Sequence, residues 1–91
     1  MLPGEDLVRK GIADLQRGVE SDEALLVSIG AVRLRRVGYE VADPLASPES
    51  RLYDRLSSEN PDAAHSRYNA LIRRLVSFER AAETLASRVD A

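Results

Sequence analysis

Several residue types that build functional sites or reinforce small folds are absent or scarce in this chain of 91 residues. It has no cysteine, no tryptophan and a single histidine. Without cysteine there is no disulfide, and one histidine is too few for a zinc site built from nitrogen and sulfur ligands. A chain this short buries only about 60–65% of its unfolded surface, so its core gains from a further stabilising device. We therefore expect a partner chain, predict a homodimer, and expect neither a metal nor another cofactor.

Long apolar runs and glycine-rich loops are also missing. The longest nearly apolar run extends from Ala24 to Val32, which is about half of the roughly 20 residues needed to cross a bilayer. The start, MLPGEDLVRK, lacks the basic and then apolar pattern of a signal peptide. The five glycines are too widely separated to form a phosphate-binding loop. These absences predict a cytoplasmic protein without membrane contact.

The charge balance is close to neutral. Thirteen basic and 15 acidic side chains give a net charge of −2, which predicts no general attraction to nucleic acid or to anionic membranes. Aromatic residues make up 4% of the chain, so there is little material for stacking on bases. With 44% apolar and 31% charged residues, the composition is typical of a folded globular domain.

Turn and capping residues divide the chain into four helical segments. Ser21, Ser47 before Pro48 and Asn60 before Pro61 are suitable N-caps, and proline is favoured at the first helical position. We predict an all-α fold, a small four-helix bundle in one domain covering residues 1–91. The expected helices cover residues 5–18, 22–37, 48–58 and 61–89, and a polar connector covers 38–47.

The first two expected helices differ in character. Residues 5–18 carry one apolar side, which includes Gly11 and would admit a close neighbour, whereas Asp14 belongs to the charged side. Residues 22–37 are apolar on all sides as far as Val32, which is the pattern of a central helix. We expect this second helix to lie in the core and to emerge at its arginine-rich end.

The last expected helix is the most informative segment, because its apolar residues recur with gaps of four and three. The repeat begins at Ala64, and its later members form the predicted self-association surface: Tyr68, Leu71, Leu75, Phe78, Ala82, Leu85 and Val89. This is a heptad pattern over more than three repeats. At 1.5 Å per residue the helix would be roughly 40 Å long, which exceeds what three short helices can cover. The seam therefore predicts a second copy of the chain against its far end.

Two arginine-rich groups form a candidate site for an acidic partner. Together with the histidine, the two groups comprise six residues: Arg33, Arg35, Arg36, His65, Arg67 and Arg74. Arginine suits such a role because its planar fork binds carboxylates and phosphates with two parallel hydrogen bonds. An alternative function is therefore a small nucleic-acid-binding regulator that uses both groups, although a solvated arginine face is the more frequent explanation of such groups.

The stretch DAAHSRYNALIRR holds the only histidine and raises the question of catalysis. Asp62 lies three residues before His65, so the carboxylate is placed to accept a hydrogen bond from the ring. Ser66 points about 100° away around the helix and is a poor nucleophile for that base. An enzyme or metal protein centred on Asp62 and His65 is thus the least favoured hypothesis. We predict a non-catalytic protein–protein interaction or regulatory module.

Overall fold

The computed structural model describes the backbone of residues 1–90 and the side chains of residues 1–88. Helix makes up 72% of the chain, and no strand occurs in the part that is described. The helices are α1 (Glu5–Gln16), α2 (Asp22–Ile29), α3 (Ala31–Arg36), α4 (Pro48–Glu59) and α5 (Ala64–Asp90). The prediction of an all-α fold is confirmed, with five helices in place of the expected four.

The first two helices pack closely against each other, and Gly11 permits this approach. A Cβ atom on Gly11 would lie 2.3 Å from the carbonyl oxygen of Glu23 and 2.7 Å from a methyl of Val27. Ser21 caps α2 as expected, since its hydroxyl accepts from the amide of Ala24 at 3.0 Å. The close approach that the position of Gly11 suggested is therefore a feature of the fold.

The helix expected over residues 22–37 is divided at Gly30. This residue leaves the helical conformation (φ −91°, ψ 10°), so α2 ends before it and α3 begins after it. The division turns Val32 outward, where 62% of it is exposed, although the run from Ala24 to Val32 suggested a buried segment. A Cβ on Gly30 would lie 2.8 Å from Glu79 and 3.1 Å from Leu75. Close packing against α5 is thus the physical context of the break.

Helix α4 begins at Pro48, as predicted, but without the expected side-chain cap. Ser47 precedes α4 but adopts a left-handed conformation (φ 47°), and its side chain makes no capping bond. Asn60 does cap the next turn, because its side-chain oxygen accepts from the amides of Asp62 and Ala63. Residues 61–63 form that turn, so α5 starts at Ala64, three residues later than expected.

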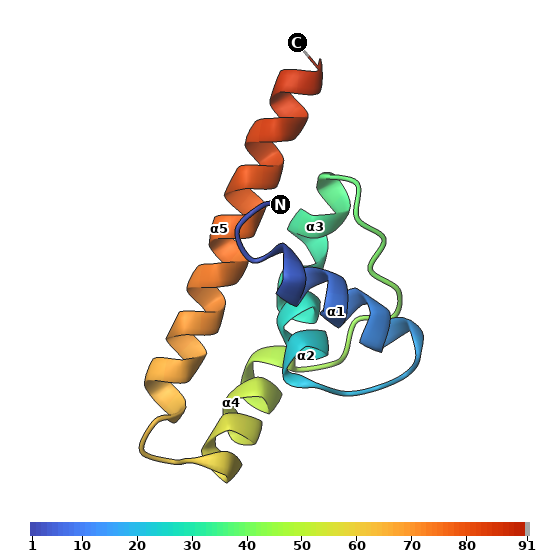
Figure 1. The fold of residues 1–91 in the computed structure, drawn as a ribbon. Coiled ribbons are helices and arrows are strands. Elements are labelled where there is room, and N and C mark those ends of the chain that lie inside the picture. The colour runs from blue at the N-terminus through green and yellow to red at the C-terminus, as the bar shows by residue number, and fades with distance from the viewer. Residues whose placement is uncertain (91) are drawn as a thin grey trace.

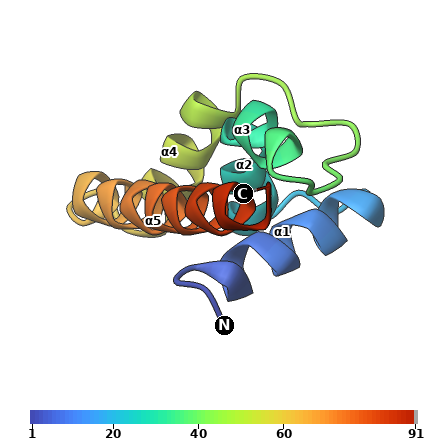
Figure 2. The same ribbon diagram turned by 90° about the horizontal axis from the view of Figure 1, so that it is seen from above.

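The long C-terminal helix is unbroken and runs along one side of the molecule (Figure 1). It spans 27 residues, and its last turns extend past the ends of the other helices. Seen from above, α1 lies on one side of α5, and α4 and α3 lie on the other (Figure 2). The principal dimensions, 46 × 26 × 20 Å, reflect this projecting rod.

All five helices contribute to one hydrophobic cluster. The buried side chains include Val8 of α1, Leu25 and Leu26 of α2, Leu52 of α4 and Phe78 of α5, none of which is exposed at all. Helix α2 is central, as its apolar pattern predicted, because it packs against α1, α4 and α5. Full burial of one such side chain stabilises the fold by about 1.5–3 kcal/mol.

Candidate interaction site

The predicted self-association seam of α5 is divided between the core and the surface. Leu75, Phe78 and Ala82 are buried against the chain's own helices, whereas Tyr68 and Leu71 are half-buried. Phe78 meets the ring of Tyr39 edge-on at 5.3 Å, and Tyr68 meets Tyr53 at 5.7 Å between centroids. The middle of the seam is therefore occupied within the chain.

The end of the seam stands clear of the other helices. Leu85 is 51% exposed, although Ala82, one turn earlier on the same side, is only 4% exposed. Val89, the last predicted member, has its side chain outside the described residues. The transition from covered to uncovered thus falls between Ala82 and Leu85.

Arg33 joins α3 to α5 and is held within the molecule. Its guanidinium binds Glu83 with two nitrogens, at 2.5 and 3.3 Å, and donates to Glu79 at 3.2 Å. Glu79 is only 3% exposed. Burial raises the pKa of the Glu79 carboxyl, which the nearby Arg33 charge opposes. The bonds from Arg33 lower the pKa of the Glu83 carboxyl.

The other two arginines of α3 differ in their surroundings. Arg35 donates from two nitrogens to the backbone oxygen of Val41, at 2.6 and 3.2 Å, and so holds the connector against α3. Arg36 is exposed and close enough to Glu83 to lower the pKa of that carboxyl. Two of the three α3 arginines predicted for an acidic partner therefore have structural bonds within the chain.

Arg67 and Arg74 lie on a different side of α5 from the arginines of α3. At about 100° per residue, Arg67 and Arg74 lie on the same side of α5. Arg33 binds Glu79 and Glu83, and these two carboxylates lie roughly 150° around the helix from that side. Six predicted residues on one surface would require these sides to coincide. The structure separates the two groups, which removes the main support for a single arginine-rich anion site.

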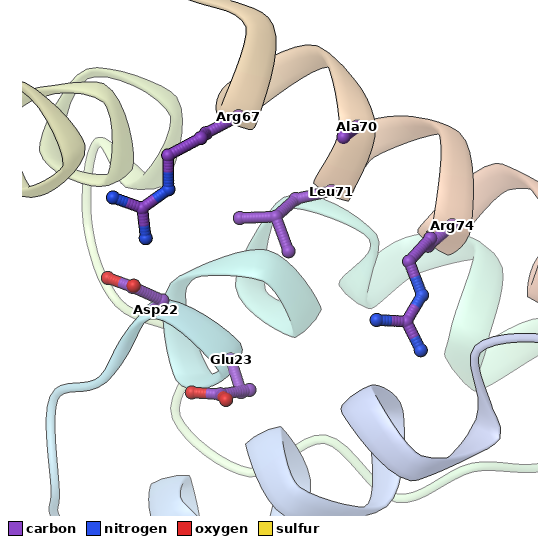
Figure 3. Close-up of a pocket in the computed structure, with 6 residues that line it drawn as sticks. All are labelled: Asp22, Glu23, Arg67, Ala70, Leu71 and Arg74. Carbon is purple, nitrogen blue, oxygen red and sulfur yellow. The ribbon is translucent and has the colours of Figure 1, made fainter. Parts of the chain in front are cut away.

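A pocket of about 340 Å³ lies between the start of α2 and the first half of α5. Its lining combines acidic, basic and apolar side chains: Asp22, Glu23, Arg67, Ala70, Leu71 and Arg74. Figure 3 shows the guanidinium groups of Arg67 and Arg74 reaching into the pocket from α5, with the two carboxylates on the opposite side. Arg67 and Arg74 are the members of the predicted site that the structure places together.

The four charged groups of this pocket are all paired with residues outside it. The ion pairs are Arg67–Glu59 at 2.9 Å, Arg74–Asp6 at 3.1 Å, Asp22–Arg55 at 2.8 Å and Glu23–Lys10 at 3.4 Å. Because each charge is already compensated and both signs are present, the pocket does not have the chemistry of an anion site. Its ion pairs instead tie α5 to α1 and α4, and α2 to α1 and α4.

His65 is exposed at the start of α5, and its neighbours do not form a catalytic group. Its Nε2 lies 3.2 Å from the side-chain nitrogen of Asn69, one turn later. The hydrogen bond to Asp62 that the spacing suggested is not formed. Across the described residues, no group of three or more histidine, aspartate or glutamate side chains is placed to hold a metal ion.

Two buried carboxylates escaped the sequence analysis. Asp14 is 1% exposed, although its place on the charged side of α1 suggested a surface residue, and Glu79 is buried on the flank of the seam. Each has an arginine within reach, but that signal is common on exposed helices as well. The folded chain brings Ser21 to Asp14 and Arg33 to Glu79, and each donates a hydrogen bond to the buried carboxylate. The spacing of residues in the sequence does not reveal these contacts.

The described helices contain no segment that is both apolar enough and long enough to span a bilayer. The fold and contacts define a small all-helical protein. Comparisons with protein-family models, curated proteins and solved structures found no match for this chain.

Proposed function

We propose that this protein is a small, non-catalytic helical interaction or regulatory module that self-associates through the end of α5. One observation carries the proposal: the apolar seam of α5 continues beyond the part that the chain covers. Leu85 is half exposed, and the flanking Ala81 and Ala86 are half-buried. A second α5 packed on this side would remove Leu85 from water and extend the buried seam.

The ion pairs of α5 also support an interaction role over a catalytic one. Arg33, Arg67 and Arg74 are each bonded to carboxylates of other elements, so their bonds hold α5 to the rest of the molecule. Among the described side chains, His65 has a hydrogen-bond partner only in Asn69. The arrangement provides a rigid rod with a projecting end, which is suited to presenting a surface to another protein.

Substitution at Leu85 tests the proposal. We expect Leu85→Asp to weaken self-association at least about tenfold, because it places a charge in a buried apolar contact. Sedimentation velocity at several concentrations measures the change in mass. Leu75 and Phe78 are unsuitable positions, since both are buried in the chain's own core and their replacement would unfold it.

Thr84→Asp is the matched control, because Thr84 is exposed and lies next to Leu85 on the other side of the helix. It adds the same charge without touching the seam, so it should leave the mass unchanged. A wild-type protein that sediments as a monomer at every concentration would contradict the proposal. Equal effects of the two substitutions would contradict the role of the seam.

A further inference from the structure

The outer side of α5 carries a second heptad pattern that is polar. Seven positions recur with gaps of four and three, and all are exposed: Ser66, Ala70, Arg73, Ser77, Arg80, Thr84 and Ser87. We call these residues the arginine face. At about 100° per residue, its centre lies roughly 160° around the helix from the apolar seam. The arginine face therefore points away from the body of the molecule.

The only charged side chains on the arginine face are basic. Arg73 donates to the backbone oxygen of Asn69 at 3.3 Å, and neither Arg73 nor Arg80 forms an ion pair within the described part of the chain. The acidic residues Glu79 and Glu83 of α5 lie on the side that receives Arg33. The whole chain has a net charge of −2, so this basic surface is local.

We propose that the arginine face binds a carboxylate-rich α-helix of another protein. Arg73 and Arg80 are two turns apart, about 10.5 Å along the axis, which matches carboxylates that recur every seven residues on a second helix. The one position of the face between them is Ser77, whose side chain is short, so the two helix backbones can approach while the arginines reach across. Arginine forms paired hydrogen bonds with carboxylates in this geometry.

Nucleic acid is the less suitable polyanion for this surface. The net negative charge of the protein opposes the long-range attraction that phosphate binding relies on. Among the aromatic residues only Tyr53, on α4, is exposed, so the arginine face offers no ring on which bases could stack. A helix with a limited number of carboxylates needs only the local basic surface.

This inference rests on the proposed function only in that both take the protein to act by binding other proteins. Self-association uses the Leu85 side of α5, and the acidic helix uses the arginine face, whose centre lies about 110° around the helix from Leu85. The two can therefore fail separately, and the experiment is done with both the wild-type protein and Leu85→Asp.

The probe is a synthetic helical peptide of about four heptads, built on alanine and glutamine with glutamate at every seventh position. Titration into isotope-labelled protein is followed through the backbone amide signals. We expect shifts concentrated at Ala70, Ser77 and Thr84, in wild type and in Leu85→Asp alike. A peptide of the same composition with its glutamates moved off the heptad spacing should bind at least about threefold more weakly, since it aligns with fewer arginines.

Charge reversal tests the role of the arginines. We expect Arg73→Glu with Arg80→Glu to weaken peptide binding by about tenfold or more, because two attractions become repulsions. Arg9→Glu with Arg36→Glu is the matched control, since it makes the same change in net charge at exposed positions away from the arginine face. Ser77→Gln leaves the charge unchanged but places a long side chain between the two arginines, and should weaken binding as well.

The outcomes divide clearly. Signal shifts on the arginine face that the double variant removes and the control retains would support the proposal. It would be overturned if the peptide shifted no signals there, or if both double variants lost binding equally. A short DNA duplex that binds this face with a steep salt dependence, while the peptide does not, would overturn it in favour of nucleic acid.

Discussion

At the scale of single residues, Asp14 joins α1 to the start of α2. Its carboxylate accepts from Lys10 and from the Ser21 hydroxyl, each at 2.7 Å, and from Arg17 at 2.5 Å. The same Ser21 caps α2, so one carboxylate orients the cap of the next helix. The bonds from Lys10 and Ser21 hold the pKa of the Asp14 carboxyl well below its ordinary value.

Asp14 therefore makes stability depend on pH in the acid range. The pKa of an unfolded aspartate is about 3.9, and the folded value is lower, so the folded chain binds fewer protons. Its contribution is complete above about pH 5 and is lost progressively as the pH falls towards the folded pKa. We expect Asp14→Asn to lower Tm by several degrees at pH 7 and to show a smaller further loss below pH 4.

Thermal unfolding between pH 7 and pH 3, followed by circular dichroism, measures both effects. Asp54→Asn is a suitable control, because Asp54 is exposed on α4 and forms no ion pair within the described residues. Its profile should follow that of the wild type. Identical pH profiles for Asp14→Asn and Asp54→Asn would show that the buried carboxylate has no special role.

Arg33 and Glu79 also make stability depend on pH, but in the opposite direction to Asp14. Burial raises the pKa of Glu79, and an unfolded glutamate has a pKa of about 4.3. The folded chain therefore binds more protons at this site, and the contribution of Glu79 is lost as the pH rises through the raised folded value. Arg33 compensates the resulting charge in the core.

Removal of Arg33 leaves the buried carboxylate without its cation. We expect Arg33→Ala to lower the free energy of unfolding by about 1–3 kcal/mol at pH 7. Acidification towards the pKa of Glu79 should recover part of the loss, because the protonated side chain carries no charge. Urea unfolding at pH 7 and pH 5 measures this difference.

Two further variants test whether the stability lost in Arg33→Ala comes from the unpaired carboxylate of Glu79. Arg36→Ala, at the exposed neighbouring arginine of α3, should change stability by less than about 0.5 kcal/mol. Adding Glu79→Gln to Arg33→Ala should restore stability at pH 7 and abolish the recovery at pH 5. If Arg33→Ala were as stable as Arg36→Ala, the ion pairs of Arg33 with Glu79 and Glu83 would contribute nothing to stability.

At the scale of elements, the distance between α1 and α2 depends on one glycine. No side chain fits at Gly11, because the nearest obstacle is a backbone oxygen of α2, which cannot rotate away. Gly30 is different: its obstacles are the side chains of Glu79 and Leu75, so an added methyl displaces atoms that have some freedom to move.

We expect Gly11→Ala to destabilise the fold by about 3 kcal/mol, at the upper end of the usual cost of overpacking. The higher helix propensity of alanine, about 1 kcal/mol, offsets only part of this cost. Gln16→Ala, at an exposed position of the same helix, should be neutral or slightly stabilising. Denaturant unfolding compares the two, and a Gly11→Ala variant as stable as wild type would refute the close contact.

At the scale of the whole molecule, the long helix determines the shape and carries both of the proposed binding surfaces. Its first two thirds complete the core through Leu75, Phe78 and Ala82. Its end projects beyond the other helices (Figure 1). Leu85 is uncovered at this end, and the outer side of the helix carries the arginine face. Self-association and binding of an acidic helix are therefore compatible on one chain.

The apolar seam of α5 could be predicted from the sequence, because it depends only on the spacing of residues within one helix. The seam from Ala64 to Leu85 could be read from spacing alone, because a helix brings every third and fourth residue to one side. Which of its members face their own chain could not be read, since that depends on how far α1, α3 and α4 extend along α5. The separation of Arg33 from Arg67 and Arg74 was hidden for the same reason.

The sequence by itself determined that this chain is helical, where most helices begin, and that α2 lies at the centre. These properties follow from local capping and from apolar patterns within one segment. The tertiary structure alone decided that the helix is interrupted at Gly30, that Asp14 and Glu79 are buried, and that the seam becomes uncovered after Ala82. Each of these depends on atoms of a distant segment, and one-dimensional spacing carries no information about that distance.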